Sequence, residues 1–119
     1  MTPELSKSLA GYHLLMILSA VNGRFNEMED AVILEYLKEE KLINTNLDAH
    51  TQYLNKLPAD DYLLHFNTAM NSFYQLSDSD DRTRFLDFAM RLVMADKKLS
   101  PGENQFIDEL FNAWEANYA

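Results

Sequence analysis

Two stretches decide the fold, MILSAVNGRFNEME at residues 16–29 and MRLVMADKKLSPGE at residues 90–103, because they align without a gap. Each reads as an apolar helix, an Asn or Asp, a basic residue, a large apolar residue, a helix cap and then a Glu. The Asn or Asp side chain can accept backbone N–H groups of the turn, and the cap starts the next helix. The large apolar residue, Phe25 or Leu99, fills the corner between the helices. The repeat predicts two helix–turn–helix units packed in one domain.

Helical periodicity continues on both sides of these units. The expected helices run from Pro3, capped by Thr2, to Asn22-Gly23, from Asn26 to residues 38–41, over residues 47–57, from Asp60 to Ser77, from Asp78 to Asp96, and from Pro101 onward. The fifth has an i, i+3, i+4, i+7, i+8 stripe of Phe85, Phe88, Ala89, Leu92 and Val93. No run alternates with period two, so no strand is expected. The prediction is an all-α, compact, single-domain bundle of six to seven helices over residues 1–119.

Composition excludes several classes of function. The chain has 119 residues, 47% of them hydrophobic, and no Cys, so it has no disulfide and no thiolate metal site. Ten Lys and Arg against 19 Asp and Glu give a formal charge of −9. That charge argues against nucleic acid and anionic membranes as partners. The apolar stretch at Leu14–Val21 is too short to span a bilayer, and no signal peptide is evident. We expect a cytoplasmic protein.

Asp96 with Glu103 is the sharpest candidate site. A carboxylate at the C-terminal end of a helix opposes the helix dipole, and a divalent cation such as Ca²⁺, Mg²⁺ or Mn²⁺ would compensate it. The alternative is that Asp96 caps its own turn while Glu103 closes a capping box, which requires no ligand. The acidic run of Asp78, Asp80 and Asp81 has the same two interpretations, a cation or basic-partner site or a solvated helix start.

Other chemistry-bearing residues give weaker signals. His13, His50 and His65 do not pair in the i, i+4 pattern of a helical zinc site, so each is expected to be a surface or half-buried residue. Six Met and fourteen aromatic residues either fill the core or form an apolar groove for a partner helix. Phe111, Trp114 and Tyr118 are the expected exposed part of such a groove, because a terminal helix has fewer neighbours to cover it. No nucleophile–base spacing or phosphate loop suggests an enzyme.

The two turns resemble the signature of the TerB-like family, the domain of bacterial tellurite-resistance TerB proteins and of DjlA-type membrane co-chaperones. That signature is an apolar helix ending Ala-Asp-Gly, then two residues, Ser or Thr, two residues and Glu. Residues 95–103, ADKKLSPGE, match it except that Lys97 replaces the Gly. Residues 20–29, AVNGRFNEME, keep the Gly but have Asn22 for the Asp and Asn26 for the Ser or Thr.

The resemblance implies a compact bundle of short helices and a non-enzymatic role in stress or tellurite resistance. It further implies a protein-interaction scaffold with weak divalent-metal contacts at Asp96, Glu103, Asn22 and Glu29. Asn22 is neutral and binds hard cations more weakly than an Asp does, which bears on the metal role more than on the fold. The alternative is a metal-independent adaptor or homodimer that uses the aromatic face of Phe111, Trp114 and Tyr118. Both hypotheses require a protein partner.

Overall fold

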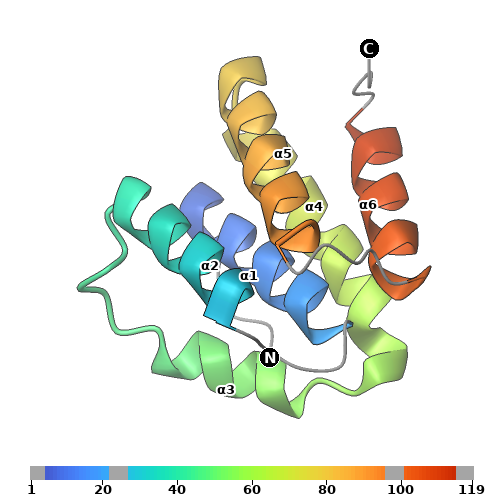
Figure 1. The fold of residues 1–119 in the computed structure, drawn as a ribbon, viewed down its shortest axis with the longest axis horizontal. Coiled ribbons are helices and arrows are strands. Elements are labelled where there is room, and N and C mark those ends of the chain that lie inside the picture. Colours follow the sequence, from blue (N-terminus) through green and yellow to red (C-terminus); the bar gives the residue numbers. More distant parts are fainter. Residues whose placement is uncertain (1–4, 22–26, 96–100, 115–119) are drawn as a thin grey trace.

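The computed structural model describes residues 5–21, 27–95 and 101–114, and within these ranges the chain forms helices and no strand (Figure 1). The elements are α1 (Lys7–Ala20), α2 (Glu27–Glu39), α3 (Asp48–Lys56), the 3-10 turn η1 (Ala59–Asp61), α4 (Tyr62–Leu76), α5 (Ser79–Val93) and α6 (Pro101–Ala113). These six α-helices confirm the predicted all-α bundle. The two predicted turns, at residues 22–26 and 96–100, lie outside the described ranges, so the repeat itself stays a prediction.

Helix α1 forms the centre of the bundle. It packs most extensively against α4, and also against α2, α3, α5 and α6 (Figure 1). Residues 10–15 and 17–19 are all buried, so this helix has no exposed face over most of its length. A helix that is apolar all round is typical of a buried position. Every other α-helix therefore contacts α1, and a polar side chain on α1 can reach several of them.

The ends of two helices show how local sequence sets their bounds. Helix α1 begins at Lys7 rather than at Pro3, so the predicted start is wrong. Ser6 has extended backbone angles and its Oγ accepts from the Leu9 N–H at 3.2 Å, which makes Ser6 the cap. Helix α5 begins with a reciprocal capping box between Asp78 and Asp81. The acidic run is thus a helix start, as one of its two interpretations predicts.

Close packing between α1 and α2 depends on Gly11. A Cβ added at Gly11 would lie 2.0 Å from the Tyr36 hydroxyl oxygen, far inside any allowed contact. That hydroxyl donates to the Ser8 carbonyl at 3.0 Å. The Tyr36 ring meets Phe85 and Phe88 of α5 edge to face, at centroid distances of 5.8 and 5.4 Å. The missing side chain at Gly11 thereby lets one tyrosine join three helices.

Helix α3 is the least anchored element. It crosses one end of the bundle, and its main contacts are with α1 (Figure 1). Leu54 is its one buried side chain, and Tyr53 is partly buried against the core. A short helix with so little buried apolar area depends strongly on its polar contacts to stay in place.

No helix within the described residues is both long and apolar enough to cross a membrane.

Candidate functional site

The three histidines of the chain meet where α1, α3 and α4 come together. His13 Nδ1 lies 2.8 Å from His65 Nε2, and His13 Nε2 lies 2.9 Å from His50 Nδ1. The His13 side chain is fully buried, His65 is 6% exposed and His50 is half-buried. The expectation of surface or half-buried histidines is therefore wrong for His13 and His65. We call His50, His13 and His65 the histidine triplet.

Burial explains the electrostatics of the triplet. Burial first, and then the charges of His65 and His50, lower the pKa of His13 from 6.5 to about 3. Burial also lowers the pKa of His65 below its ordinary value. The two buried members, His13 and His65, are therefore neutral imidazoles near pH 7, and each neutral ring has one N–H donor and one bare nitrogen acceptor. That pattern matches a row of N–H···N hydrogen bonds.

Aromatic and hydroxyl groups surround the triplet. The Tyr53 ring lies 5.0 Å from the His65 ring and 6.2 Å from the His13 ring, measured between centroids. Beside it, the Tyr12 hydroxyl and the Thr51 hydroxyl form a hydrogen bond of 3.0 Å between α1 and α3. Helix α3 is thus joined to α1 by two adjacent polar contacts, one between imidazole rings and one between hydroxyl groups.

The triplet is arranged for hydrogen bonding rather than for metal binding. The two ring nitrogens of His13 point to two different partners, so the three rings do not converge on one point. A tetrahedral zinc site would need nitrogens from several rings at about 2.0–2.1 Å from a single ion. Within the described ranges, no group of three or more His, Asp or Glu side chains is placed to hold a metal ion.

The predicted metal contacts at the turns fall mostly outside the described part. Asn22 and Asp96 lie in undescribed segments, and so does the side chain of Glu103. Glu29 is fully buried at the start of α2, where its Oε1 accepts from the Ser19 hydroxyl at 3.3 Å. This contact ties α1 to α2 on either side of the first turn. The metal role of the four residues stays a prediction.

The predicted aromatic face at the end of α6 belongs largely to the core. Trp114 is 7% exposed and Phe111 is 8% exposed, so the expectation that they form an exposed surface is wrong. The Trp114 ring stacks on Phe73 at 5.1 Å, and its Nε1 donates to the Met70 carbonyl at 3.3 Å. Helix α4 covers this aromatic face, contrary to the expectation that a terminal helix has fewer neighbours. Tyr118 lies outside the described residues.

An open groove runs between α1 and α2. It has a volume of about 460 Å³ and is mostly apolar. We call it the apolar groove. Its lining residues are Tyr12, Met16, Asp30, Ile33, Leu34 and Leu37. Leu34 is its most exposed leucine, at 44%. This groove lies between α1 and α2, away from the C-terminal aromatic residues at which the sequence analysis expects an apolar groove.

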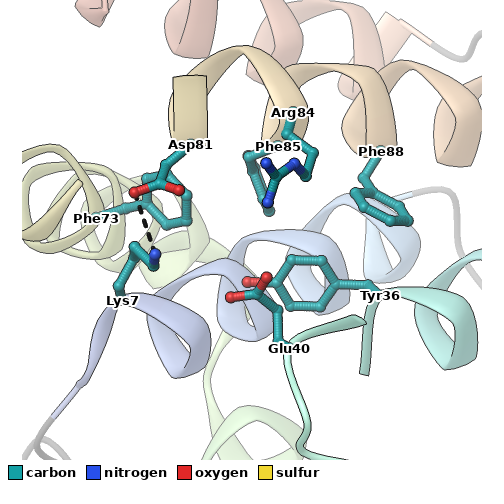
Figure 2. Close-up of a pocket in the computed structure, with 8 residues that line it drawn as sticks. All are labelled: Lys7, Tyr36, Glu40, Phe73, Asp81, Arg84, Phe85 and Phe88. Carbon is teal, nitrogen blue, oxygen red and sulfur yellow. Dashed lines mark hydrogen bonds and ion pairs between the residues drawn. The ribbon is translucent and has the colours of Figure 1, made fainter. Parts of the chain in front are cut away.

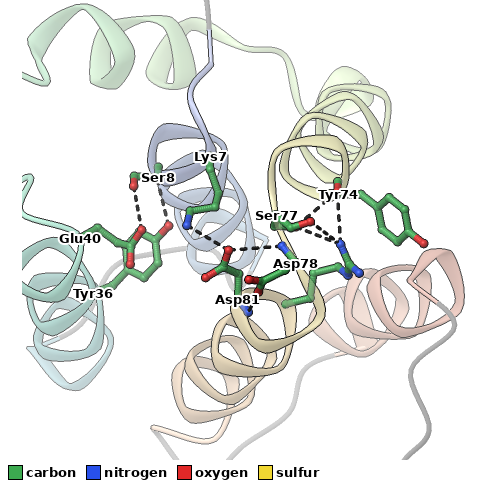
Figure 3. A network of polar contacts seen from close by, with 9 residues as sticks. Lys7, Ser8, Tyr36, Glu40, Tyr74, Ser77, Asp78 and Asp81 are labelled. Atoms are coloured by element: carbon green, nitrogen blue, oxygen red, sulfur yellow. Dashed lines mark hydrogen bonds and ion pairs between the residues drawn. The ribbon is translucent and has the colours of Figure 1, made fainter.

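Polar contacts also join α1 to α2 and α5 on another side of the bundle. We call the five residues that make these contacts the charged junction: Lys7, Ser8, Tyr36, Glu40 and Asp81. Lys7 Nζ lies 3.1 Å from Asp81 Oδ2, and the Ser8 hydroxyl donates to Glu40 at 2.7 Å (Figure 3). Tyr36 completes it through its bond to Ser8 (Figure 3). The cavity beside it, drawn in Figure 2, measures only about 10 Å³. That is roughly one water molecule, so the junction holds helices together and has no room for a substrate.

Comparison with known proteins gives no matching family model, no matching curated protein and no matching solved structure. The TerB-like resemblance of the turns therefore stays a prediction.

Proposed function

We propose that this chain is a non-catalytic helical interaction domain, and that its apolar groove binds one amphipathic, basic helix of a partner protein. The observation that carries the proposal is the open apolar groove of about 460 Å³ between α1 and α2. The proposal keeps the protein-interaction part of the TerB-like expectation. The link to stress or tellurite resistance remains an expectation from the resemblance.

The spacing of the lining residues suits a helix as the occupant. On α2, residues Asp30, Ile33, Leu34 and Leu37 follow the i, i+3, i+4, i+7 pattern. On α1, Tyr12 and Met16 are one turn apart. Two rows of this kind on neighbouring helices leave a furrow into which the apolar face of a third helix fits. Methionine and leucine side chains adapt to such a partner at low cost.

Charge selects a basic occupant. Asp30 lies in the groove itself, and Glu27 is exposed one turn before it on α2. The whole chain carries a formal charge of −9, which attracts a cationic partner and orients it during encounter. A second copy of this chain is disfavoured for the same reason, because it would bring a further formal charge of −9 against the first.

The test uses a synthetic amphipathic peptide with leucines at i, i+3, i+4 and i+7 and lysines elsewhere. We expect it to bind with a dissociation constant of about 10 μM, measured by fluorescence anisotropy. Leu34→Asp should weaken binding at least about tenfold, because it places a charge in the apolar contact. Leu64→Asp is the matched control, since Leu64 is 70% exposed on α4 and lies outside the groove.

A peptide with glutamates in place of the lysines tests the charge argument. It should bind at least about tenfold more weakly than the basic peptide, with the difference shrinking as salt is added. Equal binding of the two peptides would contradict the choice of a basic partner. Equal loss of binding in Leu34→Asp and Leu64→Asp would contradict the choice of the groove. Concentration-dependent dimerisation through Leu34 would show that the occupant is a second copy.

A further inference from the structure

We infer that the histidine triplet is a proton-operated latch, which holds α3 against α1 and α4 at neutral pH and releases it on mild acidification. The inference rests on the geometry of the three rings and does not depend on the apolar groove having a partner.

Three neutral rings carry enough hydrogens to form both contacts of the triplet. Two N···N contacts, of 2.8 and 2.9 Å, use four of the six ring nitrogens. Each contact needs one hydrogen between its two nitrogens. Three neutral rings supply three N–H groups, which satisfies both contacts and leaves one hydrogen for an outer nitrogen, on His50 or on His65. The closed latch therefore has every inner nitrogen paired when no ring is charged.

The number of hydrogens also decides at which protonation step a contact of the triplet breaks. A fourth hydrogen still fits, on the remaining outer nitrogen, so the closed triplet accepts one proton without losing a contact. A fifth hydrogen must enter a contact that already has one, which places two N–H groups face to face. A second imidazolium would also sit beside the first in a buried space, where like charges repel strongly. The closed state thus binds at most one extra proton, whereas three solvated histidines bind three.

Among the residues that the structure describes, the groups in contact with His13 include no carboxylate that would compensate a second proton. On α3 the groups that face His13 are His50 and Tyr53, on α4 it is His65, and on α1 itself it is Tyr12. The charges that act on His13 come from the other two histidines, and both disfavour its protonation. Protons taken up below neutral pH therefore favour the state in which the rings separate.

Helix α3 is the element that we expect proton uptake by the triplet to release. His13 and His65 sit on α1 and α4, which share the most extensive contact in the bundle. His50 sits on α3, whose single buried side chain is Leu54. Separating His50 from His13 breaks the weakest of these packings and admits water to His13 and His65, whose rings can then turn apart and each take up a proton. The expected open state keeps the helices α1, α4, α5 and α6 together and exposes α3 with the linked Tyr12–Thr51 contact.

Hydrogen exchange with the full chain tests the latch. Opening takes up about two protons, so lowering the pH from 7.5 to 5.5 should raise the opening constant of α3 about a hundredfold, given the ordinary histidine pKa of about 6.5. The readout is the protection factor of amides in residues 51–56. Fluorescence of Trp114, the one tryptophan and buried on Phe73, should stay native. Unchanged α3 protection, or loss of α3 and α5 protection in step, would overturn the latch.

Two substitutions separate protonation from hydrogen bonding. Asn mimics the Nδ1 position that His50 uses, and Gln mimics the Nε2 position that His65 uses, yet neither titrates. In His50→Asn/His65→Gln only His13 still titrates, so the pH effect should shrink from about a hundredfold to about tenfold. Tyr12→Phe is the matched control, because it removes a neutral contact at the same junction. It should lower α3 protection equally at both pH values.

Two further results would overturn the inference. One is a pH effect of full size in His50→Asn/His65→Gln, which would place the titrating groups elsewhere. The other is stoichiometric Zn²⁺ binding at pH 7.5 that His50→Asn/His65→Gln abolishes, since an ion would then take the place of the shared protons.

Discussion

The charged junction and the histidine triplet both fix a neighbour of α1 by buried or half-buried polar contacts, but they differ in what titrates. In the charged junction Lys7 Nζ donates to Asp81, and this hydrogen bond is the first cause that lowers the pKa of Asp81, so Asp81 stays an acceptor near neutral pH. Burial first, and then the charge of Glu40, raise the pKa of the Tyr36 hydroxyl, so it stays a donor. In the triplet each inner nitrogen either donates or accepts according to the protons present. One contact is therefore insensitive to mild acid, while the other responds to it.

The largest expected effect breaks the charged junction sterically. Gly11→Ala should destabilise the chain by about 3 kcal/mol, because the new Cβ would lie 2.0 Å from Tyr36 Oη and 2.7 Å from its Cζ. The ring would have to leave Phe85 and the Ser8 carbonyl. This loss exceeds the gain of about 1 kcal/mol from replacing a helical Gly. Urea denaturation at pH 7.5 measures it.

The rescue of that variant tests the cause. Tyr36→Phe in the Gly11→Ala background removes the oxygen at 2.0 Å but keeps the ring carbon at 2.7 Å. It should restore about 1 kcal/mol, within the usual range for relieved overpacking. A neutral Gly11→Ala substitution would show that α1 and α2 separate easily, and would contradict the close approach.

The next largest expected effect is the pH dependence of the stability that the histidine triplet contributes. Because the pKa of His13 is lowered to about 3 in the folded state, the unfolded chain binds more protons than the folded chain between about pH 6.5 and 3. The stability that His13 contributes is present above pH 6.5 and is lost as the pH falls below it. Between pH 7.5 and 5.5 the loss should be about 1.4 kcal/mol from His13, with His65 acting in the same direction.

His13→Gln isolates this contribution in the same urea measurement. Gln keeps one donor and one acceptor but cannot reach both neighbours as an imidazole does, so the variant should be less stable at pH 7.5. Its stability should fall less steeply with acidification than that of the unchanged chain. A variant with an unchanged slope would assign the pH dependence to other groups.

The charged junction and the triplet also differ in how far they can be predicted from the sequence. The buried stripe of α5 follows a local period, and its five predicted members are all buried. The capping box of Asp78 and Asp81 spans three residues, so it too can be read locally. The triplet joins residues 37 and 52 positions apart. An apolar setting for His13, between Tyr12 and Leu14, was visible in the sequence, but the matching positions of His50 and His65 depend on how three helices cross.

Burial at the chain end was misjudged for a related reason. Sequence position suggested that a terminal helix lacks neighbours, yet α6 packs against α4 and α5, and Trp114 stacks on Phe73. Local pattern identified these aromatics as one face of a helix. It did not show which helix covers that face, because the partner lies 41 positions away in sequence, from 73 to 114.

The smallest expected effect probes the charged junction by charge alone. Lys7→Met removes the ion pair with Asp81, whose side chains are 32% and 23% exposed, and should cost about 0.5 kcal/mol. The Lys7 hydrogen bond first, and then the Asp78 backbone N–H, lower the pKa of Asp81. The stability of this pair is therefore present above the ordinary Asp value of 3.8 and is lost as the pH falls below it. The Lys7→Met cost should be equal at pH 7.5 and 5.5 and should shrink in 1 M NaCl. If the cost of Lys7→Met disappeared by pH 5.5, the charged junction would respond to mild acid as the histidine triplet does. The distinction between the two would then fail.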